Sequence, residues 1–126
     1  MKVPAEIARS KQVSLVTFRK DGTPVATAVW QVSEGDTLTT VSLADAWKVK
    51  RIRNNPRVEV TPCDIRGKVP AGARAVAATA VVLPPSETER ARRLLAGRYI
   101  TARIGAAFSR LFRIKRPPAV AIVVTF

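Results

Sequence analysis

A run of cations between Lys48 and Arg53 is the part of this sequence whose residue types and spacing suit a chemical task. The run also contains Lys50 and Arg51, and it falls on a predicted short helix. Free N–H groups at a helix N-terminus, joined by lysine and arginine, can bind phosphate or carboxylate groups. The pattern therefore favours an anion site, and a solvated amphipathic helix is the alternative that it leaves open.

The flanking residues set the limits of this helix. Residues 38–41 are β-branched and apolar, which is typical of a strand. Ser42 and Asp45 can each cap a helix, because their side-chain oxygens accept hydrogen bonds from free N–H groups. Pro56 disfavours the α conformation at the residue before it, so we expect the helix to end near Asn54.

The net charge of +13 indicates an acidic partner, which can be a nucleic acid, a membrane surface or a small polyanion. Residues 90–116 hold nine lysines and arginines and no acid. A bias toward arginine and alanine codons would produce the same excess without any partner. Histidine is absent, which excludes Ser-His-Asp catalysis and disfavours a transition-metal site.

The length of 126 residues predicts one domain, 1–126, with a core of its own. No apolar run approaches the ~18 residues of a membrane span, and no apolar signal core follows Met1. Cys63 is the single cysteine, so no internal disulfide can form, and we expect it to be a buried small hydrophobe. A cytoplasmic protein is the expectation.

The hydrophobic patterning predicts a mainly β protein with short helices. An Asp-Gly turn and a second turn near Gly35 join the first three strands, so we expect a three-stranded meander. Residues 74–83 are rich in alanine and valine, which is typical of a strand buried on both faces, as in a barrel or a dimer seam. A helix capped by Ser86 follows and ends at Gly97. The predicted strands are 13–18, 25–32, 37–42, 57–62, 74–83 and 119–126, and the other predicted helices are 3–11 and 99–112.

Four segments in this order resemble the pyridoxamine 5'-phosphate oxidase-like split barrels, and within them the small deazaflavin (coenzyme F420)-dependent oxidoreductases. The resemblance covers residues 10–126. It implies a six-stranded antiparallel split β-barrel of the FMN-binding type, which forms a homodimer with two cofactor sites in its seam. The segments are VTFRKDGTPV at 16–25, VW at 29–30, Lys48 and Arg51 followed by NPRV at 55–58, and CDIRG at 63–67.

The same resemblance implies which residues bind the cofactor. Lys48 would hold its phosphate, and the neighbouring helix positions Val49, Arg51 and Arg53 would assist, while Lys50 would face solvent. The remaining implied positions are Thr27, Ala28 and Val29 along the deazaflavin ring, Val41 and Ser42 beside it, and Arg66 as a contact from the partner chain. Residues 63–67 lack the aromatics that line the pocket in several relatives, so the resemblance does not identify the substrate pocket. Trp30 and Trp47 can line a pocket or fill core, and we expect them to fill core.

The resemblance implies an F420-dependent oxidoreductase that transfers a hydride between reduced F420 and an unsaturated or quinone-like small molecule. A chain without histidine suits this activity, because the cofactor carries the chemistry. Water, Ser42 or Thr27 can supply the proton. The alternatives are an FMN-binding oxidoreductase and a basic module for nucleic acid or anionic membrane that uses residues 90–116. Few aromatics are available for base stacking, so we expect no nucleic acid, and weak anionic membrane association stays open.

Overall fold

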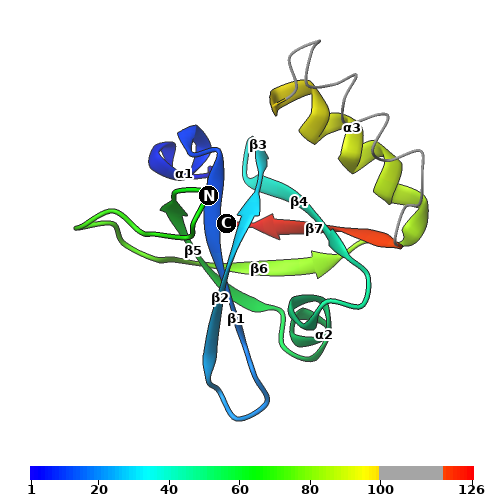
Figure 1. Cartoon of the computed structure of the whole chain (residues 1–126), viewed down its shortest axis with the longest axis horizontal. Coiled ribbons are helices and arrows are strands. Elements are labelled where there is room, and N and C mark those ends of the chain that lie inside the picture. Colours follow the sequence, from blue (N-terminus) through cyan, green and yellow to red (C-terminus); the bar gives the residue numbers. More distant parts are fainter. Residues whose placement is uncertain (100–117) are drawn as a thin grey trace.

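The computed structural model describes residues 1–99 and 118–126, which form one curled antiparallel sheet with helices at its ends and along one side (Figure 1). The fold is mainly β, as predicted. The strands are β1 (Gln12–Phe18), β2 (Pro24–Trp30), β3 (Val32–Glu34), β4 (Thr37–Leu43), β5 (Arg57–Cys63), β6 (Val76–Val82) and β7 (Ala119–Thr125). The helices are α1 (Ala5–Arg9), α2 (Trp47–Asn54), the 3-10 turn η1 (Pro85–Glu87) and α3 (Thr88–Tyr99).

The strand order is β2-β1-β5-β6-β7-β4-β3, so the consecutive strands β2 and β3 lie at opposite edges of the sheet. Gln31 separates them and carries the chain from one edge to the other. Its buried side-chain amide donates hydrogen bonds to the carbonyl oxygens of Ile7 at 3.0 Å and Ser10 at 2.6 Å. The sheet is thus bent into a split barrel, with β2 and β4 in contact without pairing.

Two predictions about the strands are wrong. The predicted strand 25–32 is divided at Gln31, so the described chain has seven strands instead of six. The predicted meander does not form, because β2 pairs only with β1, while β3 and β4 pair at the far edge. A turn signal shows that the chain reverses, and it cannot show which neighbour a strand adopts.

The core fills the inside of the barrel. Leu15 of β1 lies directly opposite Val60 of β5, Val13 and Val58 lie on the same face of the sheet as this pair, and all four side chains are fully buried. The alternation of apolar and polar residues in 57–62 predicts Val58 and Val60 on one face, and their shared burial on the inner face confirms this prediction. The apolar face of α2 packs against this cluster through Val49 and Ile52.

The helix boundaries correct the predicted caps. Ala46 is the N-cap of α2 and supplies no side-chain hydrogen bond. Ser42 is still in β4, where its hydroxyl donates to the carbonyl oxygen of Leu43 at 3.2 Å. Ser86 is not a helix cap either, because it lies within the 3-10 turn that begins after Pro84. The predicted helix end at Gly97 is also wrong, because α3 continues through this residue.

Three apolar side chains are more exposed than predicted. Trp30 and Trp47 are 45% and 69% exposed, so neither fills core. Val81 on β6 is 54% exposed, because only one face of β6 meets the interior. Within one chain, β6 is therefore not buried on both faces. The closing strand is confirmed, and the predicted helix 99–112 lies outside the described residues except at Tyr99.

Candidate functional site

Lys48 and Arg51 form a pair of cations on one side of α2. The Arg51 guanidinium is half-buried and donates a hydrogen bond from Nη1 to Oγ1 of Thr17 at 3.4 Å, and Thr17 is a fully buried residue of β1. Burial, and then the nearby charge of Arg51, lower the pKa of Lys48 below its ordinary value of 10.5. A phosphate or carboxylate next to both side chains would offset this repulsion.

The predicted ring contacts lie on the two strands that meet without pairing. Thr27 and Val29 of β2 point into the barrel, on the same face as the buried Leu15, and Ala28 points outward. On β4, Ser42 is buried on the inner face and Val41 is half-buried on the outer face. β2 and β4 contact each other, so the two predicted groups lie on neighbouring strands of the barrel.

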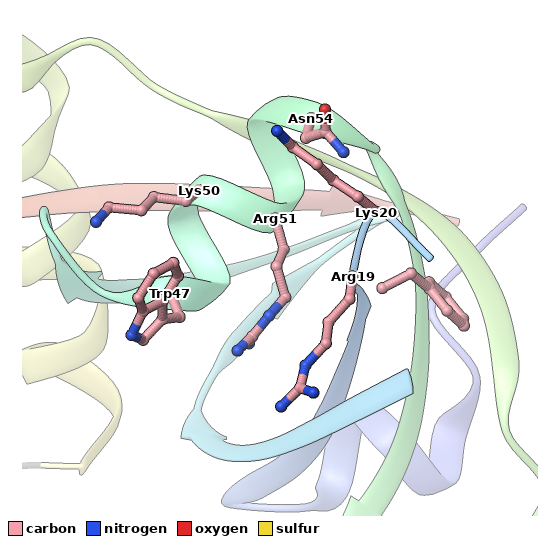
Figure 2. A pocket seen from close by; sticks show the side chains of 7 residues that line it. Arg19, Lys20, Trp47, Lys50, Arg51 and Asn54 are labelled. Carbon is pink, nitrogen blue, oxygen red and sulfur yellow. The ribbon is translucent and has the colours of Figure 1, made fainter. Parts of the chain in front are cut away.

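An open pocket of about 410 Å³ lies between the β1–β2 turn and α2 (Figure 2). Arg19 and Arg51 extend in the same direction from opposite walls, and Lys20 reaches toward Asn54. The volume is within the roughly 300–1,000 Å³ of small-molecule sites. The lining residues are Phe18, Arg19, Lys20, Trp47, Lys50, Arg51 and Asn54.

The charges of this pocket are not balanced by acids. None of its lining residues is a carboxylate. Among the described residues, the ion pairs join Arg57 to Glu59 at 3.4 Å and Arg92 to Glu89 at 4.0 Å, and none of these four residues lines the pocket. The ammonium of Lys50 lies 4.5 Å from the ring centroid of Trp47, which is a cation–π contact.

Three other predicted site residues, Val49, Arg53 and Arg66, do not line the pocket. Val49 is fully buried in the core, so it can offer a ligand no side chain. Arg53 is exposed and does not line the pocket. Arg66 is exposed in the loop between β5 and β6, next to Gly67, whose φ is +86°. A Cβ on Gly67 would lie 3.6 Å from that of Ala28, so this loop runs close to the outer face of β2.

Sequence reasoning missed the side of the pocket formed by Arg19 and Lys20. It also assigned Lys50 to solvent and Trp47 to core. Lys50 is exposed, as predicted, but it lines the pocket together with Trp47. The basic pair before the Asp-Gly turn was a visible signal. Its proximity to α2 depends on the pairing of β1 with β5 and on the packing of α2 against β1, which no local pattern shows.

Comparison with known families agrees with this geometry. Residues 2–126 match the model of the family described as pyridoxamine 5'-phosphate oxidase. The chain belongs to this family. No curated protein matches it in sequence.

Several solved structures share the fold. An F420 reductase is 24% identical with a TM-score of 0.60, and the match covers 98% of this chain and 94% of that one. A Listeria innocua protein, provisionally named a pyridoxamine 5'-phosphate oxidase, is 20% identical with a TM-score of 0.65 and coverages of 96% and 87%. An FAD-binding protein of Mesorhizobium loti is 16% identical with a TM-score of 0.62 and coverages of 100% and 91%. The confirmed prediction is thus the family and its split-barrel fold.

In residues 1–99 and 118–126, no group of three or more His, Cys, Asp or Glu side chains could hold a metal ion. Cys63 is buried, as predicted, and burial followed by the charge of Asp64 raises the pKa of its thiol. This thiol is therefore a poor nucleophile. In the same residues, no helix is both long enough and apolar enough to cross a membrane.

Proposed function

We propose that this protein is an F420-dependent oxidoreductase that transfers a hydride between reduced F420 and an unsaturated or quinone-like small molecule. One observation carries the proposal. In a chain of the pyridoxamine 5'-phosphate oxidase family, Lys48 and Arg51 form a half-buried cation pair on the helix that directly follows β4. This pair favours an anionic cofactor whose ring lies along β2 and the end of β4.

The cations and hydrogen-bond donors of the site suit the negatively charged groups of F420. F420 carries a phosphodiester and a polyglutamate tail, and the described site supplies cations and hydrogen-bond donors without an acid. Lys48 and Arg51 would bind the phosphodiester, and the hydrogen bond from Arg51 to Thr17 orients the guanidinium beforehand. FMN also has a phosphate but no acidic tail, so the remaining cations favour F420.

Bound reduced F420 supplies the hydride. The inner faces of β2 and β4 would flank the ring with Thr27, Val29 and Ser42, and they would limit the access of water. The hydroxyl groups of Thr27 and Ser42 are the groups that we propose to pass a proton to the substrate. We expect a cytoplasmic protein, in keeping with a small organic substrate.

The proposal includes a homodimer formed through the outer face of the sheet. Trp30 of β2 and Val81 of β6 are exposed there, together with small residues such as Ala26 and Ala28 on β2 and Ala77 on β6. The strand registers place all five side chains on the face opposite to the core. Burial of this apolar face against a second copy would be favourable. Arg66, in the loop next to β2, would then contact the partner's cofactor.

The experiment is a pair of binding titrations of purified protein with F420 and with FMN at several salt concentrations. We expect F420 to bind more tightly, with a preference that decreases as salt rises. Equal affinities, or a difference that is independent of salt, would favour the FMN alternative. Binding of neither cofactor, together with binding to anionic vesicles or DNA, would favour the basic module instead.

A further inference from the structure

Lys48 lies beside another cation and has no acid as its ion-pair partner. It stands three residues before Arg51 on α2, and side chains with this spacing lie on one side of a helix with Cβ atoms about 5–6 Å apart. Within residues 1–99 and 118–126, no carboxylate forms an ion pair with Lys48. No ion pair in this part of the chain therefore stabilises its charged form.

This environment makes the amine of Lys48 a nucleophile. Desolvation and a neighbouring cation are two conditions that activate lysine side chains, and Lys48 meets both. Burial, and then the charge of Arg51, lower its pKa below the ordinary value of 10.5, so a larger share of its amine is uncharged at neutral pH. Half-burial leaves the side chain within reach of a small reagent.

Arg51 provides a position for a phosphate next to this amine. Its guanidinium donates a hydrogen bond to Oγ1 of Thr17 at 3.4 Å, so it is oriented before a ligand arrives. Arg19 extends in the same direction from the opposite wall of the pocket (Figure 2). A phosphate bound by the guanidinium of Arg51 would present its attached group to the amine of Lys48.

We propose that Lys48 is a modification site for acyl phosphates, the mixed anhydrides of a carboxylic acid and phosphoric acid. The lone pair of Nζ forms an amide bond with the acyl carbon. The bond from this carbon to the phosphate oxygen breaks, and inorganic phosphate leaves with the bonding electrons, while the amine gives up one proton to water. Arg51 and Arg19 bind the phosphate and stabilise the charge that it gains on leaving.

Acylation of Lys48 removes one of the two cations that we assign to the cofactor phosphodiester. Resting on the proposed function, the acylated protein should bind F420 about tenfold to hundredfold more weakly. Bound F420 should in turn shield Lys48 from the reagent. The modification would thus reduce cofactor binding whenever acyl phosphates accumulate.

The test compares two acetyl donors on the purified protein, with each modified lysine located and quantified by peptide mass spectrometry. Acetyl phosphate carries the phosphate, and N-hydroxysuccinimidyl acetate is an uncharged donor without it. The measured quantity is the acetylation rate of Lys48 divided by that of the exposed Lys2. We expect this ratio to be about tenfold higher for acetyl phosphate, because only this donor binds to the guanidinium groups. Equal ratios for the two donors would overturn the proposal.

A pair of variants tests whether Arg51 causes the difference. Arg51→Gln should reduce the ratio for acetyl phosphate to that for the uncharged donor. Arg53→Gln removes the same charge from the same helix, but Arg53 is exposed and does not line the pocket, so this variant should react like the wild type. A change in the reactivity of the amine itself affects both donors and cancels in the comparison. An unchanged ratio in Arg51→Gln, or an equal loss in Arg53→Gln, would overturn the site.

Addition of F420 to the acetylation reaction separates this site from the proposed function. Selective acetylation of Lys48 that F420 does not slow would contradict the cofactor site and leave the modification site intact. Acetylation without selectivity for Lys48, together with tight binding of F420, would overturn the modification site and leave the proposed function intact.

Discussion

Lys48→Met should weaken F420 binding and leave the free protein as stable as the wild type, or more stable. Methionine keeps a stem of similar length and removes the charge. The ammonium would make a charge-assisted contact with the phosphodiester, worth about 1.5–3 kcal/mol. At 1.4 kcal/mol for each factor of ten, the expected loss of affinity is about tenfold to hundredfold.

The effect on stability has the opposite sign. Burial and Arg51 lower the pKa of Lys48, so the folded state disfavours the charged ammonium relative to the unfolded chain. Loss of this charge should therefore not lower the free energy of unfolding at neutral pH. The assays are cofactor titration and denaturant unfolding, with Lys2→Met as the control for net charge, because Lys2 is exposed. A variant that is less stable but binds F420 normally would refute this reasoning.

Three further predictions follow from the same structure. The affinity for F420 should fall at alkaline pH, and the fall should start below the ordinary lysine pKa of 10.5. The reason is that the pKa of Lys48 is lowered in the free protein and only the charged ammonium holds the anion. In a binding titration across pH, Lys48→Arg should abolish this fall. Gln31→Leu should lower the free energy of unfolding by about 1–3 kcal/mol in denaturant titrations, because the buried carbonyl oxygens of Ile7 and Ser10 lose their donor; a change near zero would mean that water replaces it. Sedimentation should show a dimer at micromolar concentration and Val81→Asp should shift it toward monomer, whereas a monomeric wild type would remove the two-chain site.

The parts of the fold that were predicted correctly from sequence have local causes. Alternation in residues 57–62 predicted the buried Val58 and Val60 correctly, because strand period is a property of neighbouring residues. The strand switch at Gln31 could not be predicted, because it depends on carbonyl oxygens of a helix distant in sequence. The same division holds at the site. The spacing of Lys48 and Arg51 within one helix predicted their proximity, but the approach of Arg19 and Lys20 to α2 results from packing between distant segments.

The exposed tryptophans illustrate a second limit. Trp47 was expected in the core, with a pocket as the alternative, and it lies at the rim of a basic pocket. Val49 and Ile52 supply the apolar face of α2 that packs in the core, so Trp47 is left on another side of the helix. Sequence patterning therefore assigns such a tryptophan to the core, whereas in the structure it is exposed and lines a pocket together with cations.

The location of the cofactor site is the central claim, and hydrogen–deuterium exchange with and without F420 tests it most directly. We expect slower exchange in α2, at the end of β4 and in the β1–β2 turn, with smaller changes along β2, since these segments surround Lys48, Arg51 and the pocket. Saturating F420 that leaves these segments unchanged, or protects only α3, would contradict the account.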